Sequence, residues 1–429
     1  MKVESSFDQL GILQIPPSAT LAINEKSKQL ISEGRQIVQF GFGQSPFPVP
    51  HKMVKALQQN AHRKEYLPVQ GLPRLRESIA RYYNQEYNLN FKADDIMVGP
   101  GSKELIFLIQ KAVKTGLLLP SPSWVSYAPQ AQICDKPVGW IPTFEEDRWV
   151  LTADSLENAC KANPQHKLLI VNYPSNPTGG SLGEGWAPQL AEIARRYGLL
   201  VISDEIYCPL QFDTIADSLA RWYPEGTIVT GGLSKWCGAG GWRLGVAAFP
   251  KSLNELLPAV KGLASETFTS VSAPIQFAAI ESYNFPDEIK QYLNDSRIIL
   301  KAVASFVHQK LTSCGITMPT ASGGFYLFPN FSSFKQNLSD MGITSSIQLC
   351  NLILDETGVA LLPGSDFGRP SNELTARLAF VDFDGKYALR WLSSHRDETN
   401  WQEEFIKKCC PRIIVGVEKL TRWLSNCSS

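Results

Sequence analysis

The middle of the chain alternates short, continuously apolar runs with a segment of helical periodicity. The runs Leu168–Tyr173, Leu199–Ser203, Ile228–Thr230 and Val246–Phe249 have the length of strands, and residues 183–198 between the first two are typical of a helix. Strands that are apolar at every position are characteristic of a parallel sheet that is buried on both faces. The pattern therefore predicts an α/β fold whose mostly parallel sheet is flanked by helices.

Helical periodicity also dominates the first quarter of the chain. Residues 18–34, 51–60, 72–87 and 103–114 each favour a helix, and Ile96–Val98 has the pattern of a short strand. These elements precede the apolar strands and would supply helices to one or both faces of the sheet.

The pattern changes after residues 287–311, which are expected to form one long helix. Three short apolar stretches follow it, at 323–328, 359–362 and 377–381, with helical segments between them. Short strands mixed with helices in this way predict a smaller α+β domain.

A chain of 429 residues has room for two or three domains of ordinary size. The long helix returns the chain towards its start, so we expect the N-terminal segment to pack on the small domain. The predicted division is a large domain over residues 46–290 and a small domain formed by residues 1–45 and 291–429.

Composition and charge argue against several classes of protein. The 41 lysines and arginines balance the 41 aspartates and glutamates, whereas a general nucleic-acid binder needs a basic excess. No apolar run has the length of a membrane span, and residues 1–8 lack the apolar core of a signal peptide. Nine cysteines without a CxxC pair and five scattered histidines favour free thiols in a reducing, cytoplasmic setting and no metal site.

Four polar clusters come after predicted strands, where ligands of an open parallel sheet gather. They are Gly-Pro-Gly-Ser-Lys at 99–103, Asn-Tyr-Pro-Ser-Asn-Pro-Thr-Gly at 172–179, Asp-Glu-Ile-Tyr at 204–207, and the glycine-rich stretch 231–245. Each also has an ordinary interpretation: a helix cap, a turn, a helix N-cap and a solvated loop. Taken singly, none of the four decides a function.

The chemistry of two clusters nevertheless suggests ligands. Free backbone N–H groups at the start of the helix after residue 101 would bind an anion, although neither GxxxxGK[ST] nor GxGxxG is present. Asp204 at the end of a buried strand requires either a cation or a helix to cap. In the last cluster, Trp236, Trp242 and Leu244 argue against a fully solvated loop.

The order and spacing of the four clusters together resemble the pyridoxal-phosphate aminotransferases of fold type I, in the branch that includes aspartate aminotransferase. The segment 232–245 is similar to the lysine signature of that family, and the resemblance runs from about Pro17 to Arg377. It implies an α/β fold with a large cofactor-binding domain and a smaller domain.

The resemblance also implies pyridoxal 5'-phosphate as the cofactor and assigns roles. Lys235 would form the Schiff base and then transfer protons, and Asp204 would pair with the protonated pyridine nitrogen. Tyr207 and Asn176 would hydrogen-bond the phenolic oxygen, and Trp124 would stack on the ring. The other residues assigned to the cofactor, most of them to its phosphate, are Gly101, Ser102, Lys103, Ser234, Arg243 and, from a neighbouring subunit, Tyr66.

The substrate side of the site follows from the same resemblance. Arg377 would bind the α-carboxylate bidentately, assisted by Gly43 and Asn176. Thr20 and Lys103 match residues that bind the distal carboxylate in bacterial-type aspartate and prephenate aminotransferases, although Thr20 also lies where a helix cap is expected. The expected function is transfer of an amino group between an amino acid and a 2-oxo acid, with aspartate, glutamate and 2-oxoglutarate as candidates.

Several alternatives stay open at this point. A lyase, decarboxylase or oxidase would keep the cofactor and change the reaction, because fold does not fix function. A ligand-sensing regulator would need an added DNA-binding segment, for which the residues before Pro17 leave no room. The segment 385–405 is longer and more charged than the family pattern, which puts substrate choice in doubt. Tyr66 implies a homodimer with shared active sites.

Overall fold

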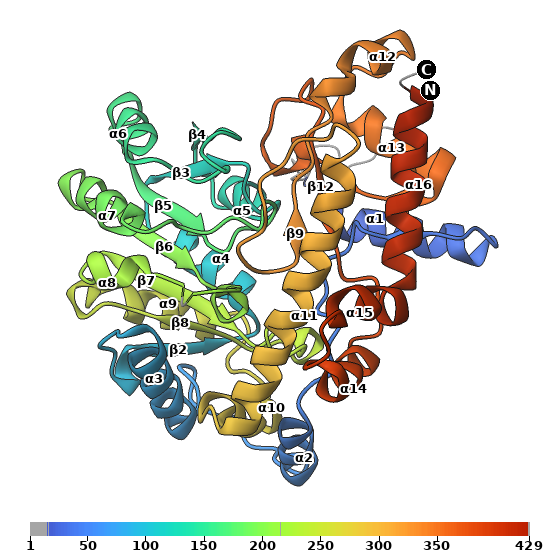
Figure 1. Cartoon of the computed structure of the whole chain (residues 1–429). Helices are drawn as coiled ribbons and strands as arrows, with labels where there is room; N and C mark the ends of the chain where they lie inside the picture. Colours follow the sequence, from blue (N-terminus) through green and yellow to red (C-terminus); the bar gives the residue numbers. More distant parts are fainter. Residues whose placement is uncertain (1–14, 16, 215, 428–429) are drawn as a thin grey trace, which may run out of the picture.

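The structure is a computed structural model that describes residues 15, 17–214 and 216–427 (Figure 1). The residues on which the expected absence of a signal peptide rests, 1–8, lie outside this part of the chain, as do residues 9–14 and 16 of the predicted segment 1–45. None of the helices in the described ranges has the length and apolar character that crossing a membrane requires. All nine cysteines are within the described ranges and are free thiols.

A seven-stranded sheet forms the centre of what we call the large unit. The strand order is β2-β8-β7-β6-β5-β3-β4. The strands are β2 (Ile96–Gly99), β3 (Gly116–Ser121), β4 (Val138–Pro142), β5 (His166–Asn172), β6 (Leu200–Asp204), β7 (Thr227–Gly232) and β8 (Gly245–Ala248). The predicted mostly parallel sheet is confirmed, because every pairing outside β8 is parallel.

Strand β8 is the exception, since it runs antiparallel to both of its neighbours, β2 and β7. A parallel strand needs a crossover, usually through a helix. Residues 233–244 between β7 and β8 contain only the short 3₁₀ turn Gly240–Trp242, so the chain returns in the opposite direction. The stretch 246–249, which we expected to join a parallel sheet, therefore pairs in the other sense.

Helices cover both faces of the sheet, as the continuously apolar strands predict. One face packs on α6 (Ala153–Ala162), α7 (Trp186–Arg196) and α8 (Leu219–Trp222), and the other on α4 (Ser102–Ala112), α5 (Tyr127–Ile133) and α9 (Leu256–Ser265). Alternate residues of β5 serve the two cores: Leu169 and Val171 face the first group, and Leu168 and Ile170 the second. The helices α2 (His51–Asn60), α3 (Pro73–Tyr87) and α10 (Ala273–Tyr283) pack together near the β2–β8 edge.

The long helix α11 (Asp287–Thr312) runs between the sheet and the small unit (Figure 1). The small unit contains a three-stranded antiparallel sheet of β11 (Leu362–Pro363), β12 (Ala376–Ala379) and β9 (Tyr326–Leu327). Its helices are α1 (Ala19–Ser32), α12 (Lys335–Asp340), α13 (Ser346–Thr357), α14 (Gly385–His395), α15 (Trp401–Cys409) and α16 (Pro411–Cys427).

The N-terminal segment joins the small unit through a pair of short strands. Strand β1 (Val38–Gln39) pairs in parallel with β10 (Val359–Ala360), more than 300 residues later in the chain. Packing of the N-terminal segment on the C-terminal part was expected, and this pairing provides it. The exact division at residues 46 and 290 remains a prediction.

Candidate active site

A cavity of about 580 Å³ lies where the carboxyl ends of the central strands meet the small unit. Its lining comes from strand ends such as Asp204, from the small unit through Arg377, and from the N-terminal segment through Thr20 and Gly43. The predicted site residues that line it are Thr20, Gly43, Gly101, Ser102, Lys103, Trp124, Asn176, Asp204, Tyr207, Ser234, Lys235, Arg243 and Arg377. The fold therefore brings together every residue that we assigned to the site except Tyr66.

Asp204 ends strand β6 and is 3% exposed. Its two carboxylate oxygens accept hydrogen bonds from the Tyr127 hydroxyl at 2.6 Å and the Thr230 hydroxyl at 3.2 Å. Burial raises the pKa of Asp204 to about 6, against the effect of these hydrogen bonds. The next helical turn, Cys208–Leu210, has Tyr207 as its N-cap, so Asp204 is not the helix cap that the sequence left open. No ion pair to Asp204 occurs in the described ranges, so a cationic ligand group would suit it.

Glu205, the next residue, lies just beyond the end of β6 and does not line the cavity. One of its oxygens accepts hydrogen bonds from Ser203 at 2.9 Å and Ser218 at 2.6 Å. Burial raises the pKa of Glu205 to about 7, the hydrogen bonds from the two serines notwithstanding. Of the two adjacent carboxyl groups, only Asp204 lines the cavity.

Lys235 follows strand β7 in the glycine-rich segment. Its ammonium donates a hydrogen bond to the carbonyl of Gly43 at 2.9 Å and lies 5.6 Å from the centre of the Tyr207 ring. The segment around it is held in place, because Trp236 is buried and Gly238 passes against the backbone of Phe47. A Cβ at Gly238 would lie 2.3 Å from that carbonyl oxygen, and its φ of +62° also favours glycine. The expectation that this segment is not a solvated loop is confirmed.

An anion-binding corner lies at the start of helix α4. Ser102 is the first residue of the helix, whose unpaired N–H groups and dipole favour an anion. The Arg243 guanidinium lies against Gly101, where a Cβ would meet its Nη2 at 2.4 Å. The pKa of Lys103 is lowered by partial burial and by the neighbouring charges of Arg243 and Lys235. Three cations around one helix N-terminus form a site for a group of high negative charge.

Arg377 on strand β12 is 1% exposed. It belongs to the small unit and lines the cavity from that side. Its guanidinium donates to the side-chain oxygen of Asn176 at 3.1 Å and to the carbonyl of Gly41 at 2.6 Å, and it stacks on Tyr326 and Phe367. Its Nε has no partner in the described ranges, and no carboxylate there forms an ion pair with it. The charge of Asp366 acts on Arg377 without forming an ion pair with it, so an anionic ligand would still suit the buried guanidinium.

The family described as "Aminotransferase class I and II" matches residues 35–380. The chain belongs to this family. Aspartate aminotransferase from Geobacillus stearothermophilus is 31% identical over 371 residues, which cover 84% of this chain and 92% of that protein. A structure of aspartate aminotransferase from Thermus thermophilus with maleate matches with a TM-score of 0.81 and 25% identity, covering 95% of this chain and 97% of that one. A structure of aromatic aminotransferase from Pyrococcus horikoshii matches with a TM-score of 0.78 and 25% identity, covering 94% and 98%.

The chain is thus an aspartate aminotransferase-like enzyme, and the expected aminotransferase function and fold are confirmed. Members of this family use pyridoxal 5'-phosphate. Segment 385–405 forms α14 and the start of α15, and none of the cavity-lining residues comes from it.

Two tyrosines of this aminotransferase line the cavity and were not identified from the sequence. Tyr127, at the start of α5, holds the carboxylate of Asp204. The Tyr326 hydroxyl lies 2.9 Å from that of Tyr207, and a Cβ at Gly43 would lie only 2.0 Å from it. Only glycine at position 43 leaves room for that hydroxyl pair.

Tyr66 is the one predicted residue that lies outside the cavity. It is 90% exposed and lies in the loop between α2 and α3. Its exposure leaves the ring free to contact another subunit. Its predicted contact with a neighbouring subunit stays a prediction.

Proposed function

We propose that this aminotransferase binds pyridoxal 5'-phosphate in the cavity around Lys235 and uses it to exchange amino groups between an acidic amino acid and a 2-oxo acid. One observation carries the proposal: a buried carboxylate, Asp204, and a buried guanidinium, Arg377, line the cavity of Lys235, and neither forms an ion pair in the described ranges. Such a pair of groups suits a ligand that is cationic at one point and anionic at another.

The donor set fits the cofactor group by group. The α4 N-terminus, Ser234 and Arg243 offer N–H, hydroxyl and guanidinium donors for a phosphate. Asp204 offers a carboxylate for a protonated pyridine nitrogen, and the side chain of Trp124 offers an aromatic face. The residues that would hold the phenolic oxygen are Tyr207 and Asn176.

The chemistry then divides among the residues of the chain. When bound, the cofactor supplies an electron sink for the bonds at the substrate Cα. Asp204 would keep the ring nitrogen protonated, Arg377 would orient the α-carboxylate, and the neutral amine of Lys235 would take the proton from Cα and deliver it to the cofactor carbon that receives the amino group. Because Arg377 and Lys235 come from different units, both units must be in place before the proton can move.

A half-reaction screen tests the proposal directly. Each amino acid is added to the cofactor-loaded protein, and the visible band of the bound cofactor is followed together with the release of 2-oxo acid. We expect the band to fall in step with 2-oxo acid formed, most readily with aspartate or glutamate. Release of carbon dioxide, or loss of substrate without any 2-oxo acid, would instead favour the decarboxylase or lyase reaction.

Lys103 is expected to set the preference for acidic substrates. The Thr20 hydroxyl is buried without a partner in the described ranges, and both residues line the cavity, so the two could bind a second carboxylate. The N-cap of α1 is Ser18, which makes no side-chain capping bond. Lys103→Met should lower kcat/KM for aspartate and glutamate by roughly ten- to a hundredfold, the value of a charge-assisted hydrogen bond of about 1.5–3 kcal/mol.

The loss should be selective, which provides the control. Alanine and phenylalanine should react with Lys103→Met nearly as fast as with the unmodified enzyme. Lys111→Met, in the last turn of the same helix, should change neither class of substrate, since Lys111 does not line the cavity. An equal loss for acidic and neutral substrates would mean that Lys103 serves the phosphate or the fold.

A homodimer with shared sites is the proposed assembly, supported by the exposure of Tyr66. Tyr66→Phe should weaken cofactor binding by about tenfold or more, because one hydrogen bond to a charged phosphate is lost. Mixing Tyr66→Phe subunits with Lys235→Ala subunits should restore sites of normal affinity, since each hybrid dimer has one site where both residues are intact. Titration of cofactor into the re-associated mixture measures them. A monomer at working concentration, or a mixture without restored sites, would contradict sharing.

A further inference from the structure

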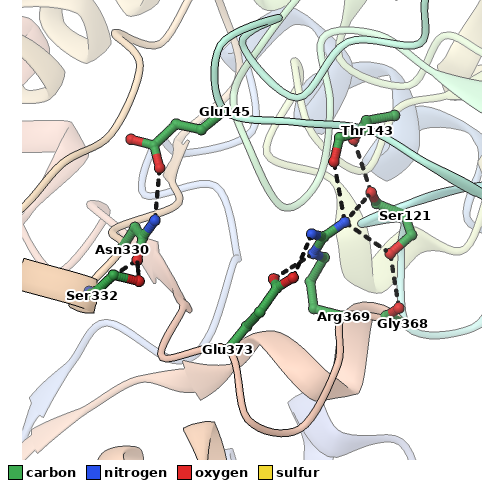
Figure 2. Close-up of polar contacts among 8 residues, drawn as sticks. All are labelled: Ser121, Thr143, Glu145, Asn330, Ser332, Gly368, Arg369 and Glu373. Carbon is green, nitrogen blue, oxygen red and sulfur yellow. Dashed lines mark hydrogen bonds and ion pairs between the residues drawn. The ribbon is translucent and has the colours of Figure 1, made fainter. Parts of the chain in front are cut away.

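A second charged cluster lies beside the cavity, where residues 121–123 of the large unit meet residues 367–369 of the small unit. Figure 2 shows the Arg369 guanidinium between two groups of acceptors. Its Nη1 donates to the carbonyls of Ser121 at 2.8 Å and Thr143 at 3.2 Å, at the carboxyl ends of β3 and β4. Its Nε and Nη2 donate to the two oxygens of Glu373 at 2.8 and 2.7 Å.

The burial of this cluster separates it from an ordinary surface ion pair. The side chain of Arg369 is 7% exposed, and its guanidinium lies 4.8 Å from the centre of the Trp149 ring. A bidentate, desolvated guanidinium has one geometry, whereas an exposed ion pair tolerates many. Moving the two units apart would take this donor from the Thr143 carbonyl, whereas the Ser121 carbonyl would keep the hydrogen bonds from the amide and hydroxyl of Thr143.

Two more hydrogen bonds join the same segments. The Ser121 hydroxyl donates to the carbonyl of Gly368 at 2.7 Å, and the Ser123 amide donates to the carbonyl of Phe367 at 3.0 Å. The residue after Ser123 is Trp124, which lines the cavity. The segment that ends β3 is therefore hydrogen-bonded to three successive residues of the small unit, 367–369, just before Trp124.

The small-unit side of these contacts leads directly to Arg377. The ring of Phe367 lies 5.2 Å from the Arg377 guanidinium, and the amide of Gly364 donates to the carbonyl of Thr375 at 2.8 Å. Residues 364–369 are thus joined directly to strand β12 and to the segment before it. Arg369 connects the part of the small unit that carries Arg377 with the loop that carries Trp124, and it lines no part of the cavity itself.

A separate hydrogen bond ties the loop after β4 to the small unit. The Asn330 side-chain amide donates to the Glu145 carboxylate at 2.7 Å, and the Asn330 oxygen accepts from the amide and hydroxyl of Ser332 (Figure 2). Glu145 lies two residues after Thr143, so this loop is held at two points. Arg369 is the central member of a set of contacts that joins the two units along one edge of the cavity.

We propose that Arg369, oriented by Glu373, is a positioning residue that fixes the distance between Trp124 and Arg377. The inference rests on the proposed function, in which Trp124 stacks on the cofactor ring and Arg377 binds the α-carboxylate. A substrate that reacts on a cofactor held by Trp124, while Arg377 holds its carboxylate, needs the two residues in one geometry, and a misplacement of about 1 Å can cost about a hundredfold in rate. Arg369 secures that geometry without touching substrate or cofactor.

The test compares R369M and R369K with the unmodified enzyme, using maleate as a dicarboxylate probe. Calorimetry on the cofactor-loaded proteins measures the Kd for maleate, and a separate titration measures cofactor affinity. For R369M we expect the Kd for maleate, and the KM for amino acid and 2-oxo acid, to rise about tenfold or more, while cofactor affinity stays within about threefold. R369K should lie between, because one ammonium cannot donate to both sets of acceptors.

Arg195 provides a control with similar hydrogen bonding within the large unit, although its side chain is 49% exposed and that of Arg369 is 7% exposed. It also donates to both oxygens of one carboxylate, Glu225, as well as to the carbonyl of Trp222, and it lies 5.1 Å from the centre of the Tyr223 ring. All of these partners are in the large unit, so R195M should lower the melting temperature and leave the Kd for maleate unchanged.

If Arg369 only stabilised the fold, R369M would behave like R195M. If R369M lowered the melting temperature with an unchanged Kd for maleate and unchanged KM values, the positioning role would be wrong. If R369M did not fold, E373Q would decide by the same readouts, with a smaller expected rise of about three- to tenfold. Failure of the unmodified protein to bind maleate would contradict the proposed function as well, whereas unchanged binding in the variants contradicts this inference alone.

Discussion

Lys235→Ala is expected to lower transamination by at least about three orders of magnitude. The variant loses both the amine that attaches the cofactor and the base that moves the proton, and the second loss alone costs roughly 10²–10⁴-fold. Attachment is read separately: borohydride reduction of the loaded protein followed by digestion should place the pyridoxyl label on Lys235 in the unmodified enzyme and nowhere in the variant. In the structure Lys235 donates only to the carbonyl of Gly43, so its removal disturbs little else.

Two controls show whether this loss is chemical. The fold of Lys235→Ala should survive, as measured by its circular dichroism and melting temperature, because the buried neighbours Leu233 and Trp236 hold the segment. Lys111→Met should keep the label on Lys235. A label on any other lysine in the unmodified enzyme, or activity of Lys235→Ala within tenfold of normal, would remove Lys235 from its assigned role.

The α/β fold was predictable because its central strands have an unambiguous pattern. The runs at 168–171 and 199–202 are apolar at every position, which is typical of strands in a sheet that is covered on both faces. The long helix was equally clear from its 3.6-residue periodicity over 287–311, and the structure places it at Asp287–Thr312. Local patterns of this strength survive in any tertiary context.

Elements whose formation depends on distant partners were not predictable. Strand β3 is a central strand, but its Leu117–Leu119 run follows the helical run 103–114 without a clear break and is followed by Pro120, which argues against a central strand. Strand β1 has two residues and is defined only by its pairing with Val359 and Ala360. The antiparallel sense of β8 follows from the lack of a crossover helix, which the apolar pattern of the strand itself does not report.

The candidate site was predictable where chemistry and spacing coincide in the sequence. Asp204, Lys235 and Arg377 have residue types that the reaction needs, and the fold places all three in one cavity. Tyr127 is different, because nothing in the sequence around it indicates a role in the site. Only the folded chain places it against Asp204. Arg369 is similar, because its acceptors on the large unit lie some 225–250 positions earlier in the chain.

Asp204→Asn is expected to fold and to lose most of its turnover. Asparagine has the shape of aspartate and keeps hydrogen-bonding groups for Tyr127 and Thr230, but it has no charge to hold a proton on the ring nitrogen. Removing one partner of a buried ion pair costs about 3–5 kcal/mol, which corresponds to roughly two to four orders of magnitude in kcat. Pre-steady-state measurement of the half-reaction with aspartate measures the loss at the chemical step.

The pH dependence of stability gives a second, independent readout for Asp204. Burial raises the pKa of this group from 3.8 to about 6 in the cofactor-free protein. Between these values the folded state binds a proton that the unfolded state has released. The contribution of Asp204 to the free energy of unfolding is therefore fully present below pH 3.8 and falls, by about 3 kcal/mol, as the pH rises through about 6.

A cationic ring nitrogen next to Asp204 would reverse this effect, because it favours the ionised carboxylate and lowers its pKa. The stabilisation that the cofactor gives the unmodified protein should therefore grow between pH 5 and pH 8. In Asp204→Asn this growth should be absent, and subtracting the two proteins removes the titration of the cofactor's own phosphate. Urea unfolding of both proteins, with and without cofactor, at pH 5 and pH 8 gives the stabilisation by the cofactor for each protein at each pH. If the cofactor stabilised both proteins with the same pH dependence, Asp204 would not face the ring nitrogen. Near-normal turnover of Asp204→Asn would lead to the same conclusion.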